Sequence, residues 1–176
     1  MGCSSSLENK KIACSSSVYG SRSIALSPKQ KKIVQSTWLL LEPKKNELGV
    51  QIFLSLFEAI PSLQQVFPEF RNVKLETLKT ERSLHGHTKR VMKVVENAVT
   101  SLEDPDSMIE YLLELGRRHR YRQIKPKPLH LEEICKCIKT TFMVYLGSEW
   151  TTDVAESWNI FLDSVISLIK EGLHRT

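Results

Sequence analysis

The sequence predicts an all-α protein of seven to eight helices. Apolar residues recur at three- and four-residue steps over most of the chain, which is the spacing of an amphipathic helix. Only seven glycines and seven prolines interrupt the 176 residues, and no segment gives a convincing strand pattern. A chain of this length can form one domain with a sizeable core. We therefore expect one helical domain that follows an N-terminal tether.

The composition is that of an ordinary globular protein, with 41% apolar and 26% charged residues. The net charge of +5 permits contact with anionic membranes or nucleic acid but requires neither. No apolar run approaches the roughly 18–20 residues that span a bilayer, and the N-terminus lacks the apolar core of a secretory signal. Cys135 and Cys137 point in different directions on one helix, so we expect free thiols in a reducing cytosol.

The first six residues fit the N-myristoylation pattern Met-Gly-x-x-x-Ser. Removal of the initiator methionine would expose the Gly2 amine, and Cys3 beside it is a natural thiol for palmitate. Residues 4–27 are rich in serine, which predicts a flexible tether with Cys14 as a further acylation candidate. An ordinary disordered terminus that happens to begin Met-Gly-Cys is the alternative. We expect residues 1–26 to form the acylated tether and residues 27–176 the folded domain.

The first helix is expected to begin at Ser27. Serine at the N-cap, Pro28 at the first helical position and Gln30 three residues after the cap form a helix-start pattern, and Pro43 ends the helix. The next helices are expected over about 45–59, 61–67 and 81–99.

Two further helices are expected over about 105–120 and 129–146, separated by a loop in which Pro126 and Pro128 prevent helix formation. The last helix is expected to be capped by Asp153 with Glu156 and to end at Gly172.

Two of these helices carry a histidine among apolar residues. His87 continues the apolar face of residues 81–99, and His119 follows Leu112 and Leu115 at helical spacing. Two helices that each direct an imidazole into an apolar interior could hold a flat metal cofactor between them. For each histidine, a hydrogen-bonded residue of an ordinary core is the alternative.

From about Leu26 to Leu173 the chain resembles the globin family. The matching features are ordered along the chain: Trp38, Pro61, Phe67, His87-Thr-Lys-Arg-Val-Met, Leu115-Gly-Arg-Arg-His119 and Trp158. The two histidine segments look most like those of neuroglobin and globin X. The Met-Gly-Cys start is similar to that of acylated, membrane-attached globin X proteins.

The resemblance implies a haem b cofactor with His119 as proximal ligand and His87 as distal residue. It also implies that the second nitrogen of His119 donates to a carbonyl or similar acceptor, and that His87 binds the iron directly in a six-coordinate resting state. Phe67 would lie against the porphyrin, Val91 would crowd the ligand pocket, and Phe53 would line its far wall. For Phe57 and Phe70 we expect only a packing role.

Charged residues near the histidines have two interpretations each. Arg90 resembles the basic residue that pairs with a haem propionate, and a solvated surface side chain is the alternative. The six cations between Arg117 and Lys127 would favour reduced iron or form a docking patch for an acidic partner or anionic lipid. The loop from Lys125 to Pro128 is more basic and proline-rich than in common oxygen carriers.

The functional hypothesis is a membrane-tethered haem protein on the cytoplasmic face of the plasma membrane. It would bind O2, NO or CO reversibly, exchange electrons with an unidentified donor, and act in redox sensing, signalling or protection. One alternative is an enzyme of the nitrite reductase type, and another is an oxygen store or carrier for oxygen transport. No nucleic-acid motif is present, and the basic loop is short and poor in stacking aromatics.

The tether interpretation predicts that Gly2→Ala moves the protein from membranes to the cytosol, because only Gly2 offers an amine for myristate. Cys3→Ser should release it partly or wholly, since one myristoyl chain binds with an affinity only on the order of 10⁴ M⁻¹. Fractionation of expressing cells, with haem absorbance followed beside the protein, measures both effects. An identical distribution of wild type and both variants would refute the lipid anchor.

Overall fold

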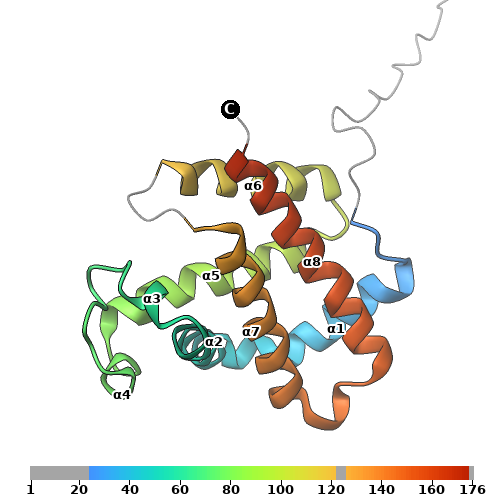
Figure 1. Cartoon of the computed structure of the whole chain (residues 1–176). Coiled ribbons are helices and arrows are strands. Elements are labelled where there is room, and N and C mark those ends of the chain that lie inside the picture. The colour runs from blue at the N-terminus through green and yellow to red at the C-terminus, as the bar shows by residue number, and fades with distance from the viewer. Residues whose placement is uncertain (1–23, 122–125, 175–176) are drawn as a thin grey trace, which may run out of the picture.

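The computed structural model describes residues 24–121 and 126–174, which form eight α-helices and two short 3-10 helices (Figure 1). In order these are α1 (Pro28–Leu41), η1 (Glu42–Lys44), α2 (Lys45–Ala59), α3 (Pro61–Gln64), α4 (Leu75–Leu78), α5 (Arg82–Thr100), α6 (Pro105–Arg120), α7 (Pro128–Leu146), η2 (Gly147–Glu149) and α8 (Thr152–His174). The predicted all-α class is confirmed. The lipidation candidates Gly2, Cys3 and Cys14 lie outside the described residues.

The expected start of the first helix is present. The Ser27 hydroxyl accepts a hydrogen bond from the Gln30 backbone N–H, and the Gln30 side chain accepts one from the Ser27 backbone N–H. A similar cap begins α6, where the Asp104 carboxylate accepts from the Ser107 N–H at 3.2 Å. Within the described segments, no helix combines the length and apolar character needed to cross a membrane.

The region between α3 and α5 differs from the expectation. The helix predicted over 61–67 ends at Gln64, and the short helix α4 was not foreseen. The Gln64 side chain is buried and donates to the carbonyls of Phe70 and Val73 at 2.9 and 2.6 Å. These bonds add to the backbone turn bonds of this segment, where the Phe70 carbonyl also accepts from the Val73 N–H at 3.2 Å. Periodicity carries no signal for such a contact.

Three boundary predictions in the last third were wrong. Pro128 is the first residue of α7 and does not prevent it, since the first turn of a helix needs no N–H from that position. The Thr151 hydroxyl, and not Asp153, accepts from the Val154 N–H at the start of α8, while Asp153 pairs with Lys29 at 2.6 Å. Gly172 lies within α8, which continues to His174.

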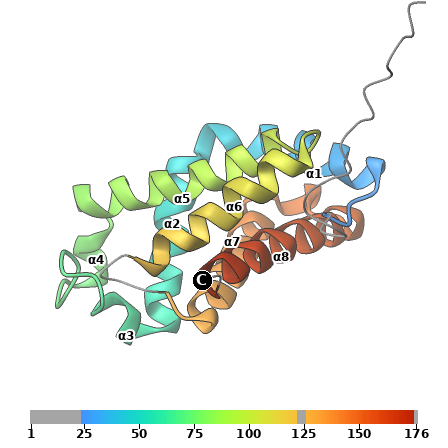
Figure 2. The same ribbon diagram turned by 90° about the horizontal axis from the view of Figure 1, so that it is seen from above.

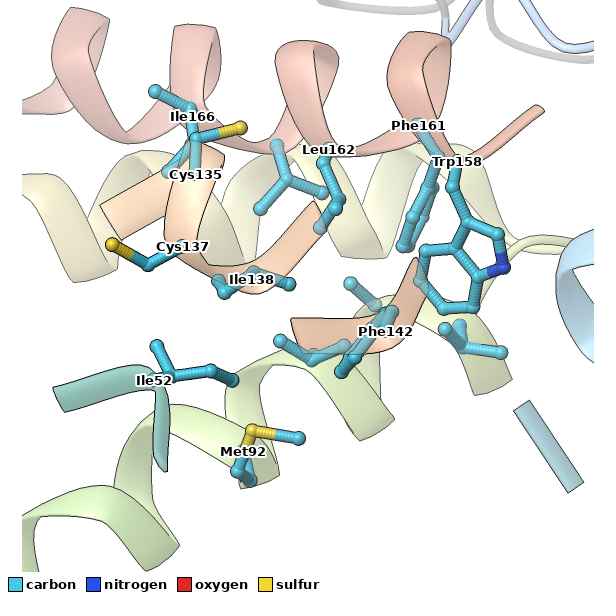
Figure 3. Packing of buried hydrophobic residues seen from close by; sticks show 14 of the residues in the cluster. Ile52, Met92, Cys135, Cys137, Ile138, Phe142, Trp158, Phe161, Leu162 and Ile166 are labelled. Carbon is cyan, nitrogen blue, oxygen red and sulfur yellow. The ribbon is translucent and has the colours of Figure 1, made fainter. Parts of the chain in front are cut away.

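The core is closed by an aromatic cluster between α1, α7 and α8. Phe142 lies edge-on to Trp158 with ring centroids 5.0 Å apart, and Trp158 lies edge-on to Phe161 at 5.6 Å (Figure 3). The Trp158 indole N–H donates to the Thr37 hydroxyl at 2.9 Å, so the one polar atom of this ring is satisfied inside the core. The cluster fixes α8 against α1 and α7.

Helix α6 lies against α8 with almost no side-chain layer between their backbones. A Cβ atom on Gly116 would lie 2.2 Å from the Ile169 carbonyl oxygen, and one on Gly172 would lie 2.1 Å from the Leu113 carbonyl oxygen. Real Cβ atoms do not approach backbone atoms so closely, so both positions require glycine. Helices α2 and α5 also approach closely at a glycine, but there the neighbour is a side chain. A Cβ on Gly49 would lie 2.9 Å from the Met92 Cγ atom.

We predict that Gly172→Ala lowers the free energy of unfolding by about 1–3 kcal/mol or more, because the new methyl group would meet the Leu113 carbonyl. Gly86→Ala is the matched control, since its Cβ would meet only the Arg90 Nη1 atom, at 3.9 Å. That variant should be unchanged or more stable by up to about 1 kcal/mol through helix propensity. Urea unfolding of the two variants measures both values, and equal stabilities would contradict the close contact.

Candidate functional site

The two histidines lie at matching positions on a pair of neighbouring helices. Figures 1 and 2 show α5 and α6 running in opposite directions, joined by a short turn. His87 lies 13 residues before the end of α5 at Thr100, and His119 lies 14 residues after the start of α6 at Pro105. At 1.5 Å per residue, both side chains arise about 20 Å from the turn. The fold therefore brings the two predicted ligands to the same end of the helix pair.

His119 is half-buried in the last turn of α6, and its Nδ1 atom lies 2.8 Å from the Leu115 carbonyl oxygen. Because a carbonyl only accepts, Nδ1 must carry the hydrogen atom. In the neutral ring the Nε2 atom then keeps a lone pair, which is able to bind a metal ion. A carbonyl acceptor of this kind was expected from the sequence, and the structure identifies it as the residue four positions earlier on the same helix.

His87 is half-buried between two phenylalanine rings. Its ring lies edge-on to Phe53 of α2, with centroids 5.0 Å apart, and edge-on to Phe67 after α3, with centroids 5.3 Å apart. Phe53 is fully buried, whereas Phe67 remains partly exposed. The structure thus joins three of the predicted site residues. Behind them, Phe57 and Phe70 are buried in the core, which agrees with the packing role expected for both.

The remaining predicted residues lie on the outer part of α5. Val91 is partly buried and packs against the core one turn after His87. Arg90 is exposed, and its Nη2 atom lies 3.3 Å from the His87 Nδ1 atom. The sequence had suggested a propionate partner or a solvated side chain for Arg90 and did not foresee this contact. The propionate role stays a prediction.

These residues fit a haem. A porphyrin supplies four iron ligands itself, so the protein must provide one or two axial nitrogen atoms and an apolar wall. His119 offers a lone pair on Nε2, and the half-buried side chains of Phe67, Val91 and Leu115 offer apolar surface that the core leaves uncovered. Among the described residues, no group of three or more His, Cys, Asp or Glu side chains gathers to hold a bare metal ion.

The basic segment after Leu115 is less positive than its sequence suggests. Arg117 pairs with Glu110 at 2.7 Å and with Glu114 at 2.8 Å, and Arg118 pairs with Glu114 at 2.9 Å. The arginines hold the pKa of the Glu114 carboxyl below its usual value. Both acids belong to the preceding turns of α6 and lie before the segment from Arg117 to Lys127. Residues 122–125 of the segment lie outside the described residues.

A separate groove of about 390 Å³ lies between α7 and α8. The Cys135 thiol borders it and lies 3.6 Å from the Asp163 carboxylate, which also accepts from Lys139 at 2.7 Å. Burial raises the pKa of Cys135 to about 11 and also raises the pKa of Cys137. Both thiols are free, as expected, and both are protonated at neutral pH. The raised pKa values disfavour the thiolate, which is the reactive form of a cysteine.

Comparison with known proteins supports the fold and identifies the family. The globin family model matches residues 50–169, a range that contains both histidines. The chain is 26% identical to hemoglobin subunit alpha-D of Sturnus vulgaris, over 83% of this chain and 97% of that one. It is 28% identical to cytoglobin-1 of Oryzias latipes, over 85% of this chain and 84% of that one.

A solved structure shares the arrangement of helices. It is described as a hexacoordinated heme protein from an anhydrobiotic tardigrade, and it superposes with a TM-score of 0.82 over 86% of this chain and 97% of that one. The two sequences are only 19% identical, so this likeness concerns the fold.

We predict that Cys135 is alkylated slowly at pH 8 and that its rate rises about tenfold per pH unit toward pH 11. The raised pKa leaves only about one thousandth of the thiol ionised at pH 8, and the thiolate is the reacting form. Mass spectrometry after iodoacetamide treatment measures the rate site by site, with a small-molecule thiol as control. Alkylation of Cys135 as fast as that control at pH 8 would contradict the buried, protonated thiol.

Proposed function

Because the chain belongs to the globin family, we propose that His119 would hold the haem iron and that His87 would compete with small ligands for it. Haem b is the cofactor of this family, and its iron binds small gaseous ligands such as O2. The task of this chain is therefore to hold the cofactor, to control access to it and to exclude water from it.

The observation that carries the proposal is the hydrogen bond between the His119 Nδ1–H group and the Leu115 carbonyl, at 2.8 Å. It fixes the tautomer and the ring orientation of His119, and it leaves the Nε2 lone pair for a metal. An ordinary core histidine could make the same bond. Because the globin family model also covers His119, within residues 50–169, we prefer the ligand role over that of an ordinary core histidine.

The neighbours of His87 support a distal role in which the imidazole binds the iron when no external ligand is present. Phe53 and Phe67 hold the ring from two sides. An external ligand must then displace His87, which lowers the apparent affinity in proportion to the open fraction. The description of the tardigrade protein as hexacoordinated accords with this proposal.

Within the family, we propose a role in redox sensing, signalling or protection at the cytoplasmic face of the plasma membrane, where acyl chains on Gly2 and Cys3 would hold the protein. A lipid anchor offers little to an oxygen carrier that must diffuse. The nitrite reductase alternative rests on an available iron site together with a basic surround that attracts an anion and favours reduced iron. The pairing of Arg117 and Arg118 with Glu110 and Glu114 weakens that motive, so ligand binding remains our first choice.

We predict that His119→Ala greatly weakens haem retention and that His87→Ala does not, because the two residues have different roles. His119 anchors the iron, whereas His87 only competes with ligands. Haem titration of both apoproteins, followed at the Soret band, measures retention. Equal retention in the two variants would contradict the assignment. The spectrum of the ferrous, unliganded wild type tests the resting state, since sharp α and β bands indicate six-coordination and one broad band does not.

A further inference from the structure

The contact between Arg90 and His87 determines which nitrogen of His87 carries its hydrogen atom. The Arg90 Nη2 atom lies 3.3 Å from the His87 Nδ1 atom. A guanidinium group has five N–H donors, no acceptor, and does not lose its proton in proteins. In this contact Nδ1 must therefore accept. A neutral imidazole has one N–H, so the hydrogen atom of His87 lies on Nε2.

This tautomer is the opposite of the one that His119 adopts. The Leu115 carbonyl places the hydrogen atom of His119 on Nδ1 and leaves Nε2 with a lone pair. The Arg90 guanidinium places the hydrogen atom of His87 on Nε2. This nitrogen cannot bind iron until the hydrogen atom has left it. The two imidazoles are thus prepared for different tasks, one as a metal ligand and the other as a hydrogen-bond donor.

We propose that Arg90 is a positioning residue that favours the Nε2–H tautomer of His87 and thereby weakens the bond between His87 and the haem iron. The proposal rests on the distal role given to His87 above. It makes six-coordination conditional: His87 binds iron only when its hydrogen atom moves to Nδ1 and Arg90 turns away. Arg90 then favours external ligands. Such a ligand meets the Nε2–H donor of His87, and His87 has no lone pair on Nε2 with which to compete for the iron.

The surroundings of Arg90 allow both arrangements. Arg90 is exposed and lies three residues after His87, a spacing that brings side chains together on a helix. A Cβ on Gly86 would lie 3.9 Å from the Arg90 Nη1 atom, so the guanidinium extends back over a residue with no side chain. The His87 ring is held by Phe53 and Phe67, whereas Arg90 has a long and flexible stem. The guanidinium can therefore move without displacing the ring.

Two substitutions of Arg90 test the proposal in the haem-loaded protein. Arg90→Leu removes the donor to Nδ1, and Arg90→Glu replaces it with a carboxylate that accepts from an Nδ1–H group. The six-coordinate fraction of the ferrous protein should rise from wild type to Arg90→Leu to Arg90→Glu. CO binding should slow in the same order, by about ten- to a hundredfold overall, the size expected for one charge-assisted hydrogen bond.

A matched control and a second readout separate the tautomer from general electrostatics. Lys89→Glu makes the same change of charge at the neighbouring exposed position of α5 and should leave the six-coordinate fraction and the CO rate unchanged. Long-range proton–nitrogen NMR of the diamagnetic ferrous CO complex reports the tautomer of His87 directly. It should show Nε2–H in wild type and a shift toward Nδ1–H in Arg90→Glu.

Specific outcomes would overturn the proposal. An Nδ1–H tautomer in the wild-type CO complex would contradict it, as would a CO rate that Lys89→Glu lowers as much as Arg90→Glu does. Unchanged coordination in both Arg90 variants would also contradict it. Failure of the proposed function is a different result: the wild type would then show no Soret band after supply of haem, or His119→Ala would retain haem as well as His87→Ala.

Discussion

The contact of α6 with α8 at Gly116 and Gly172 is the constraint on which the site depends. At this point the two backbones touch, and even one methyl group would lie about 2 Å from a carbonyl oxygen. His119 lies three residues after Gly116, less than one helical turn away. The close approach of α6 to α8 therefore fixes the position of the His119 imidazole relative to α8. Helix α8 is in turn fixed to α1 by the hydrogen bond from Trp158 to Thr37. The position of His119 therefore depends on the packing of the whole core.

The opposite helix is held in a similar but looser way. Gly49 of α2 lies against Met92 and Thr88 of α5, and Thr88 is the residue after His87. Lys45 adds an ion pair with Glu96 at 2.9 Å, which links α2 to α5 and holds the pKa of the Glu96 carboxyl below its usual value. An ion pair of this kind contributes only modestly to stability when its groups are partly exposed. The firmer contact thus lies beside His119, the proposed anchoring ligand, and the looser contact lies beside His87, the proposed distal residue.

Hydrogen bonding gives the two histidines their different characters. Both are half-buried on amphipathic helices, and both lie next to apolar side chains. A backbone carbonyl at His119 and a guanidinium at His87 place the hydrogen atom on opposite nitrogens of the two rings. The carbonyl belongs to the helix and cannot move independently of it, whereas Arg90 is an exposed and flexible side chain. Such an arrangement suits the two roles that we propose, a permanent ligand at His119 and an adjustable competitor at His87.

The sequence alone predicted the longer helices and the family, and it singled out the two histidines as candidate ligands. Apolar periodicity and caps such as Ser27 with Gln30 act over a few residues, so they can be recognised without the fold. Only the tertiary structure decided the role of Gly172, which the sequence suggested as a helix end but which lies at a contact between backbones. The same holds for Gln64, whose partners follow it by six and nine residues. The acids that pair with Arg117 lie three and seven residues before it on the same helix, so their spacing is already present in the sequence. Arg90 and His87 are only three residues apart, yet which atoms meet depends on how Phe53 and Phe67 orient the ring, because distant segments supply those phenylalanines.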